Sequence, residues 1–363
     1  MKLQYQKQSK VNKQEISEIH RLSKDLEDYI VFQDGVIITK QVSSEFDDLD
    51  VLTYDKALEK YPHLFTELEQ EKHPTDDAYQ YNFAECNSGL LLYLPKNKRI
   101  TKPLHIFYAA TNEEFTHNTL IYLEEQSELN YFEHLLSTSI GSFNYVSNAI
   151  VKEDANLTYG ALSNLGKDVA SFVYRNASVE RYGVSKYSLA DVGDATQLMY
   201  QTTNLNGMYA SGTSKTIAIT SGAQEAKYQT LVEHNAKNSE GYIEHYGVAN
   251  NESALIFEGI GQINKGMKQS IARQQNHGIV LGEKARLDAN PFLLIDEYDV
   301  EASHGAAIGK IDDEELYYLM SRGLDEKAAQ RLIINGFLSP VMNLLETDTL
   351  KDMFLKRVEE KTL

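Results

Sequence analysis

The chain has 363 residues, a formal net charge of −18 and a single cysteine, and these values exclude several classes of protein. So acidic a chain is a poor nucleic-acid binder, because nonspecific binding depends on positive charge against phosphates. One cysteine cannot form an internal disulfide and fits a reducing compartment, so the cytoplasm is the expected location. No apolar run approaches the roughly 20 residues of a membrane-spanning helix, and no secretory signal is visible. The 23 tyrosines and only 6 prolines favour extensive β-structure.

Residues 1–103 are expected to form a mixed region of helices and strands. Apolar residues recur at helical spacing over 14–30 and again over 56–70, where Pro62 is expected to kink or shorten the helix. Between these two segments, residues 29–39 are predicted to form a hairpin around a central Asp-Gly pair.

Two further strands are predicted to close this region. They begin near Leu90 and Lys102 and are joined by a loop that contains Asn97 and Pro103. Cys86 lies in the polar stretch that precedes them. A lone cysteine is more often a small buried hydrophobe than a ligand, and Cys86 is interpreted in that way.

Residues 104–302 are predicted to form a β-rich core. No proline occurs from Leu104 to Asn290, and short runs alternate between apolar and polar residues. In a loose repeat, a polar turn and a small residue precede each run, and the first four small residues, spaced 28, 22 and 18 apart, are Ser127, Ala155, Ala177 and Ala195. Stacked coils of a parallel β-helix would give such turns, and proline would remove hydrogen bonds from its central strands. An antiparallel sandwich or barrel has similar spacing and stays open on the pattern alone.

Residues 303–363 are predicted to form a helical region after a glycine-punctuated extended segment. Asp312 is a plausible N-cap, Gly323 occupies the expected C′ position, and Asp325 can cap a second helix that stops before Pro340. The inner face of that second helix is predicted to contain Ala329, Leu332, Ile333 and Phe337. A last amphipathic helix is expected in the tail from residue 348 onward.

The sequence contains none of the common catalytic motifs. It has no phosphate-binding loop, no dinucleotide fingerprint, no nucleophile elbow and no zinc-binding H-E-x-x-H pattern. His234 and His245 lie in strand-like sequence, too far apart for one turn of a helix. A β-helical carbohydrate-active enzyme would need clustered carboxylates, whereas the acidic residues here gather at turns. No catalytic residue is therefore assigned.

Several short motifs together suggest a family. They are Ser303-His304-Gly305, Gly309, Tyr318-Leu319, Ser321-Arg322-Gly323, Ala328 and Phe337, with Val232–Asn235, Phe257–Gly259 and Ala272–Gln274 upstream. This set, over roughly residues 110 to 340, resembles the SufB/SufD family of the SUF iron–sulfur cluster assembly system. The resemblance implies a mainly β fold: a right-handed parallel β-helix core flanked by an N-terminal α/β region and a C-terminal helical region.

The resemblance also gives His304 a role. In SufD members of the family, the matching histidine lies at the SufB–SufD interface and is linked to cluster assembly, and neutral imidazole is a suitable iron ligand. On the residues alone, a histidine that hydrogen-bonds across the strand-to-helix junction is the plainer interpretation. The chain has Ala302 where some SufD members have a cysteine. It also has no cysteine over 272–281, where SufB members carry one; His277 lies at or near that position. The pattern is therefore closer to the SufD branch.

A SufD-like chain would be a non-catalytic subunit of a SufBCD complex. The resemblance implies a SufB-like partner and a SufC-like ABC-type ATPase, and the candidate SufC contacts are Tyr317, Arg322, Gly323 and Ala328. It also allows a homodimer of the isolated chain. No stably bound cofactor is expected, only transient iron or an iron–sulfur cluster within the complex. A SufB-type cluster scaffold and a β-helical carbohydrate-active enzyme stay open as alternatives, and an exposed Cys86 near His304 would favour direct cluster ligation.

Overall fold

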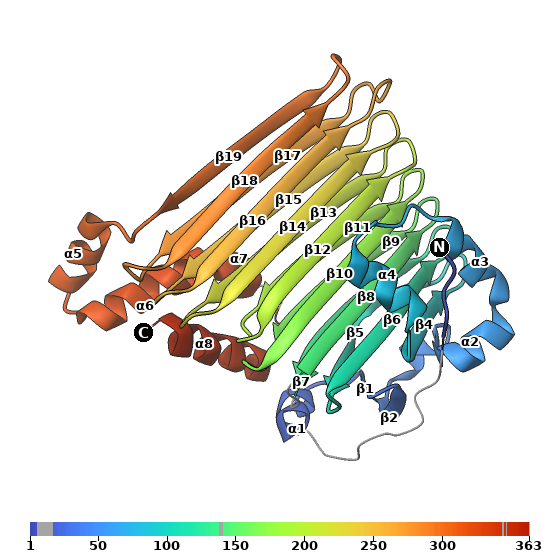
Figure 1. The fold of residues 1–363 in the computed structure, drawn as a ribbon, viewed down its shortest axis with the longest axis horizontal. Coiled ribbons are helices and arrows are strands. Elements are labelled where there is room, and N and C mark those ends of the chain that lie inside the picture. Colours follow the sequence, from blue (N-terminus) through green and yellow to red (C-terminus); the bar gives the residue numbers. More distant parts are fainter. Residues whose placement is uncertain (6–16, 138–140, 343–344, 346, 363) are drawn as a thin grey trace.

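The computed structural model describes residues 1–5, 17–137, 141–342, 345 and 347–362, which form a parallel β-solenoid with helices on both outer faces (Figure 1). From residue 88 on, the chain winds between two sheets, so that strands of one alternate in sequence with strands of the other. Every pairing in both sheets is parallel except β1 with β2 and β3 with β4 at the N-terminal end. The predicted parallel β-helix core is confirmed, and the antiparallel sandwich is wrong.

The strands and helices have the following bounds. The ten-stranded sheet contains, in spatial order, β19 (Glu301–Gly309), β17 (Ile271–Val280), β15 (Glu240–Ala249), β13 (Ser211–Thr220), β11 (Val184–Asp191), β9 (Asn156–Asn164), β7 (Glu128–Ser137), β5 (Arg99–Ala110), β1 (Tyr29–Gln33) and β2 (Val36–Gln41). The nine-stranded sheet contains β18 (Arg286–Ile295), β16 (Ala254–Ile263), β14 (Glu225–His234), β12 (Thr196–Leu205), β10 (Val169–Val179), β8 (Gly141–Val151), β6 (Glu114–Leu123), β4 (Ser88–Leu94) and β3 (Asp50–Thr53). The helices are α1 (Ser17–Ser23), α2 (Tyr54–Lys60), α3 (Pro62–Gln70), α4 (Asp77–Ala84), α5 (Asp313–Ser321), α6 (Glu326–Phe337), α7 (Ser339–Met342) and α8 (Asp348–Thr362), and a short 3₁₀ turn spans Ser44–Phe46.

The repeat length of the solenoid explains part of the sequence pattern. From β7 on, strands of the ten-stranded sheet begin at residues 128, 156, 184, 211, 240, 271 and 301, so that each turn takes between 27 and 31 residues. Ser127 and Ala155 precede equivalent strands, and their spacing of 28 is one true turn. Ala177 lies inside β10 and Ala195 precedes β12 in the other sheet. The predicted spacings of 22 and 18 therefore mix positions that are not equivalent.

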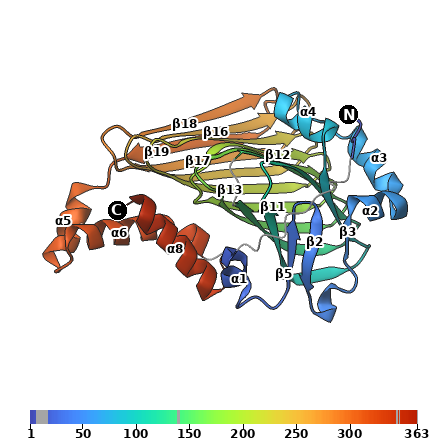
Figure 2. The same ribbon diagram turned by 60° about the horizontal axis from the view of Figure 1, so that its bottom comes forward.

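Helices cover the outer faces of both sheets, on opposite sides of the solenoid (Figure 2). Apolar residues of α1 and α8, such as Leu22 and Phe354, pack in one cluster with Ile217 of the ten-stranded sheet. On the other side, α2 to α4 pack on β4, β6, β8 and β10 of the nine-stranded sheet, with Tyr79 and Phe83 of α4 in that cluster. This arrangement leaves the ends of the stack to be closed by other means.

The C-terminal helix α8 is fixed to the solenoid by polar contacts as well. Arg357 donates to the Val192 carbonyl and, at 2.6 Å, to Asp194 Oδ2. The buried Lys361 Nζ donates to Asp194 Oδ1 at 2.8 Å and to Gln224 Oε1 at 2.9 Å. Because two cations converge on one turn of the solenoid, α8 holds a defined position beneath the ten-stranded sheet.

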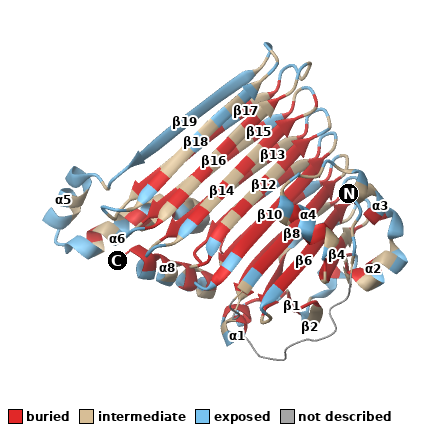
Figure 3. Cartoon of the chain, viewed as in Figure 1, coloured by how far each residue is buried: buried red, intermediate tan, exposed pale blue. Residues whose placement is uncertain are grey.

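Burial decreases along the stack towards its C-terminal end (Figure 3). The main core is continuous from β1 and β3 to Leu287 in β18. Every residue of β19, by contrast, is exposed. The solenoid therefore has one end covered by the N-terminal region and one end open.

Most predicted N-terminal elements are present, with two corrections. The hairpin turns at Asp34 and Gly35, which both have positive φ, and Pro62 divides the predicted second helix into α2 and α3. The first helix ends at Ser23 rather than at residue 30, because Ile30 enters β1; residues 14–16 lie outside the described residues. Pro103 lies within β5 rather than in a loop, at an irregularity in the pairing with β7.

The predicted helical hairpin is α5 and α6. Asp312 and Asp325 accept backbone hydrogen bonds as N-caps, and Gly323 follows the first helix with a φ of 100°. The predicted inner face of α6 is partly wrong: Ala329 is buried, but Leu332 is exposed. Ile334 takes its place in the packing, because the helix docks on the solenoid along a face rotated from the predicted one.

Candidate functional site

Strand β19 forms an open edge of the ten-stranded sheet. It pairs in parallel with β17, and no other strand in the described part of the chain pairs with it. The Glu301 backbone N–H donates to the Ser270 carbonyl, so odd-numbered residues of β19 direct their polar backbone groups towards β17. Because the direction alternates along a strand, the groups of Ala302, His304 and Ala306 point away from β17. An edge of this kind is a template for pairing with another chain.

The nine-stranded sheet ends in the same way at β18. This strand pairs only with β16 within the described residues, and its outer face carries Phe292 and Leu294, which are 46% and 51% exposed. Ile308 of β19 is also exposed. The last turn of the solenoid thus combines unpaired backbone with exposed apolar side chains, a combination typical of a protein-binding surface.

His304 lies in the middle of this edge. It is opposite Gln274 in the pairing of β17 with β19, and it is exposed. Gln274 is buried inside the solenoid, and side chains opposite one another in a ladder share a face, so the His304 imidazole stands on the side of the lumen. In the described part of the chain, no three His, Cys, Asp or Glu side chains are placed to hold a metal ion. Within the described residues, the exposed His304 imidazole is therefore not part of such a group.

The other two residues considered for cluster chemistry lie elsewhere. His277 is opposite Ala307, and both side chains point away from the lumen. The His277 ring stacks on the Tyr246 ring on the outer face of the sheet, with 5.0 Å between the ring centroids. Cys86 is fully buried beside β4, near the opposite end of the stack. Since β4 and β18 are seven strand spacings apart in their sheet, roughly 33 Å separates those strands. The condition that would favour direct ligation, an exposed Cys86 near His304, is not met.

Burial also makes Cys86 chemically inert. The loss of solvent raises the pKa of its thiol to about 12, and Sγ contacts the Ser88 carbonyl at 3.2 Å. Because the thiolate is the reactive form, we expect iodoacetamide to label Cys86 at least about 100-fold more slowly in the native protein than in urea. Mass spectrometry of labelled samples measures this ratio. Equal labelling in both states would contradict the buried position of the thiol.

Helix α5 projects beyond the solenoid, and its junction with α6 forms a second exposed region (Figure 1). Tyr317 is 76% exposed, and the Arg322 guanidinium lies 5.1 Å from the Tyr318 ring centroid. Gly323 is exposed, and Ala328 is half-buried, with its backbone N–H donating to the Asp325 side chain. The α5 helix has no buried residue. The four predicted SufC contacts thus lie at one helical corner, and their role stays a prediction.

The solenoid interior contains a polar cluster that sequence patterns do not reveal. The Arg175 guanidinium donates to Glu133 Oε1 through Nε at 2.8 Å and through a second nitrogen, and both side chains are buried. The other carboxylate oxygen accepts hydrogen bonds from the hydroxyls of Tyr145 and Tyr159. Burial and the nearby carboxylate hold the pKa of both tyrosines well above the usual value. Arg175 and Glu133 form an ion pair inside the solenoid, with 2% and 0% of their side-chain surface exposed.

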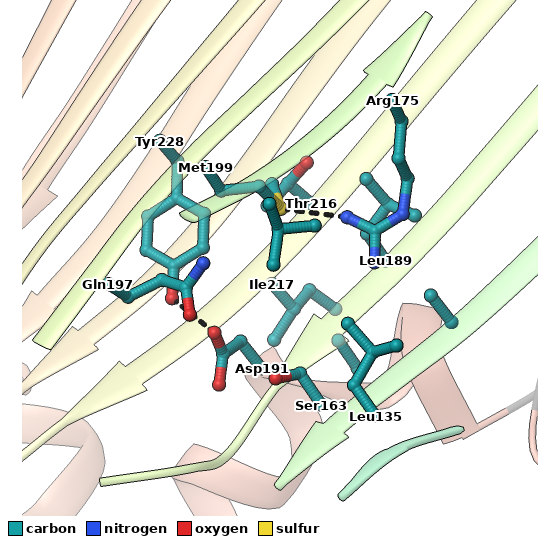
Figure 4. Close-up of a pocket in the computed structure, with 13 residues that line it drawn as sticks. Leu135, Ser163, Arg175, Leu189, Asp191, Gln197, Met199, Thr216, Ile217 and Tyr228 are labelled. Carbon is teal, nitrogen blue, oxygen red and sulfur yellow. Dashed lines mark hydrogen bonds between the residues drawn. The ribbon is translucent and has the colours of Figure 1, made fainter. Parts of the chain in front are cut away.

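An interior cavity adjoins this cluster (Figure 4). Arg175, Asp191 and Tyr228 are among its lining residues, and the Tyr228 hydroxyl donates to Asp191 at 2.8 Å. Burial raises the pKa of the Asp191 carboxyl. The cavity offers only about 10 Å³ to a water-sized molecule, near the minimum for one water. It is too small for an organic substrate.

A larger groove, of about 590 Å³, lies outside the solenoid across β10 to β16 next to α4. Its floor is mostly apolar, with Phe172, Leu198 and Ile256, and Glu225 is the one carboxylate among its lining residues. A glycosidase needs a pair of carboxylates across the scissile bond. The groove therefore gives no support to a carbohydrate-active enzyme.

No helix in the described residues is long and apolar enough to cross a membrane. The fold and its open end define a β-solenoid protein with an exposed sheet edge suited to pairing with another chain.

Sequence comparison identifies the family. Residues 106–337 match the sequence profile described as "SUF system FeS cluster assembly, SufBD core domain". The chain is 38% identical over 285 residues to the iron-sulfur cluster assembly protein SufD of Bacillus subtilis, which covers 77% of this chain and 65% of that protein. It is 27% identical over 297 residues to an iron-sulfur cluster assembly SufBD family protein of Staphylococcus epidermidis. That match covers 79% of this chain and 63% of the relative. The chain thus spans somewhat less than two thirds of these two relatives. It belongs to the SufBD family.

Proposed function

We propose that this chain is a SufD-like subunit of a SufBCD-type complex, which supports iron–sulfur cluster assembly and has no active site of its own. The observation that carries the proposal is the open last turn of the solenoid, which presents His304 on an unpaired edge in a member of the SufBD family. The named relative from Bacillus subtilis is itself an iron-sulfur cluster assembly protein SufD, which supports the same role.

The proposed partner at the open end is a SufB-like subunit. Its own last strand would add to β19, and its apolar residues would cover Phe292, Leu294 and Ile308. A homodimer of the isolated chain would use the same edge, because the same backbone groups are available to either partner. The two associations would therefore compete.

Iron or a nascent cluster is the cargo of this interface rather than a resident cofactor. His304 would supply one imidazole, and the partner would supply the thiolates that clusters require. Ala302 replaces the cysteine of some SufD members, and Cys86 is buried far away, so this chain offers no thiolate at the edge. A SufB-type scaffold role for this chain is disfavoured for the same reason.

The proposed partner at the α5–α6 corner is a SufC-like ABC-type ATPase. Tyr317 and Arg322 would provide exposed aromatic and guanidinium contacts, which are common anchors in protein interfaces. Gly323 and Ala328 would allow close approach of the partner backbone. ATP hydrolysis by that partner would then move the helices relative to the β19 edge.

The test of the proposed function is anaerobic purification of the tagged chain at native expression, with the mass of the recovered complex. We expect a complex that contains an ABC-type ATPase and a second SufBD family member. His304→Ala should keep this complex but lose cluster formation on it, whereas Tyr317→Ala combined with Arg322→Ala should lose the ATPase. Recovery of the chain without an ATPase under gentle conditions would refute the proposal.

Pairing through the β19 backbone makes a separate prediction. Ala306→Pro removes a backbone N–H that points away from β17, so the solenoid should fold while strand addition loses one hydrogen bond and meets the proline ring. We expect affinity for the second family member to fall at least about 100-fold, measured by biolayer interferometry. Ala306→Ser keeps the N–H and should bind like the original chain. Equal binding by the proline variant would exclude β19 as the paired edge.

A further inference from the structure

The strand that carries His304 is weakly held by ordinary packing. All nine residues of β19 are exposed, and β17 is its only paired neighbour in the described chain. Gly305, beside the imidazole, has no side chain, and a Cβ built there would meet nothing within 4 Å. Glycine restricts its backbone less than any other residue. Besides the backbone hydrogen bonds of the ladder with β17, a side-chain contact helps to define the backbone at this point.

That contact comes from inside the solenoid. Asn276 of β17 is buried, and its Nδ2 donates to the Gly305 carbonyl at 3.3 Å. Its Oδ1 lies 2.8 Å from Nδ1 of the buried His245 in β15. Nε2 of His245 lies 2.9 Å from the Thr230 hydroxyl of β14. The three side chains link four strands and end on the residue next to His304.

The hydrogen bonds that link Thr230, His245 and Asn276 have one consistent donor-to-acceptor direction. Since the Asn276 amide nitrogen donates to Gly305, its amide oxygen must accept, so the proton of His245 is on Nδ1. Nε2 then accepts from the Thr230 hydroxyl. The Phe257 ring stacks on the imidazole at 4.7 Å and fixes its plane. Each group is thus oriented by the one before it.

Gly259 and Gln274 leave room for these polar side chains and add to their hydrogen bonds. A Cβ at Gly259 would lie 2.7 Å from Gln274 Oε1 and 3.6 Å from the His245 ring, so glycine leaves room for both side chains. Gln274 Nε2 donates to the Phe292 carbonyl of β18 at 2.7 Å. Both strands of the open turn are therefore held by amide side chains from the turn below.

We propose that Thr230, His245 and Asn276 form a positioning relay that fixes the β19 backbone at Gly305 and thereby holds His304 at the open end. The relay replaces the apolar packing that the last turn lacks. The importance of the relay for function rests on the proposed role of the β19 edge. Its effect on the β19 backbone needs no partner and can be measured on the monomer.

Hydrogen–deuterium exchange of the full chain, at a concentration where it is monomeric, tests the relay. Asn276→Leu is close in shape but neither donates nor accepts, so peptides covering residues 301–309 should exchange about fivefold faster than in the original chain. Asn204→Leu is the matched control: Asn204 is also buried and donates to the Ala177 carbonyl at 3.3 Å, but in a distant turn. It should leave exchange in β19 unchanged.

A second pair of variants removes any ambiguity from misfolding. Thr230→Val keeps the shape but loses the hydroxyl and should speed exchange in β19 about twofold, whereas Thr230→Ser should restore the original rate. Unchanged β19 exchange in both Asn276→Leu and Thr230→Val would overturn the relay. If the original chain fails to recruit any partner, the proposed function fails, while the exchange rates still decide the relay.

Discussion

Replacement of Arg175 by methionine is expected to lower the free energy of unfolding by about 3–5 kcal/mol, because it leaves the Glu133 carboxylate buried without its cation. Both side chains lie in the solenoid interior, with 2% and 0% of their surface exposed. The hydroxyls of Tyr145 and Tyr159 would still donate to Glu133, but they carry no compensating charge. Urea unfolding followed by circular dichroism measures the change.

Two controls separate the charge effect from loss of packing. The double variant Glu133→Leu with Arg175→Met removes both charges and should recover most of the lost stability. Lys284→Met breaks the exposed pair with Glu252, at 2.7 Å, and should change stability by less than about 1 kcal/mol. If Arg175→Met alone unfolds within about 1 kcal/mol of the original chain, the buried pair contributes far less than its geometry indicates.

Local sequence signals predicted the parts of the fold that depend on local chemistry. Asp312 and Asp325 cap helices, and the Asp34-Gly35 pair turns a hairpin, because each feature is decided by a few adjacent residues. The absence of proline between residues 104 and 290 correctly indicated central strands. The choice between a parallel solenoid and an antiparallel sandwich needed the family resemblance, because both folds share the same alternation.

The polar interior could not be predicted, because it is assembled from distant turns. Glu133 and Arg175 are 42 residues apart in the sequence, and alternation suggests that charged residues face solvent. Tyr182 and Tyr209 occupy turn positions with positive φ, where asparagine or glycine would be expected. Gly259 belongs to no nucleotide-binding motif, and only the structure shows that it makes room for Gln274 and the His245 ring.

The candidate site was found by resemblance and placed by the structure. The motif around His304 identified the residue, but only the register of β19 shows that the imidazole stands on the lumen side of an open turn. Only the structure separates Cys86 from that edge, since 218 residues of sequence say nothing about distance in a solenoid. For the helices, the pattern could not distinguish the buried Ala329 from the exposed Leu332.

Acidification from pH 6.5 to pH 5 is expected to destabilise the native state by several kcal/mol, through buried neutral histidines. Burial lowers the pKa of His234 and of His245 to about 4, and it holds the pKa of His117 and His134 well below the usual value. An unfolded histidine has a pKa near 6.5. As the pH falls through that value, these histidines bind protons in the unfolded state but stay neutral in the native state. Each such histidine therefore costs about 1.4 kcal/mol of stability per pH unit down to its native pKa.

The buried carboxyl of Asp191 has the opposite effect on the pH dependence of stability. The raised pKa of Asp191 lets the native state bind a proton before the unfolded state does, which adds stability as the pH falls. Urea unfolding at pH 7, 6.5, 6, 5.5 and 5 gives the slope. His234→Gln should reduce that slope by about 1.4 kcal/mol per pH unit, and His63→Gln, on the exposed face of α3, should leave it unchanged. Equal stability of the original chain at pH 5 and pH 7 would mean that these histidines are not buried in the neutral form, and the interior hydrogen bonds from His234 and His245 would need to be assigned again.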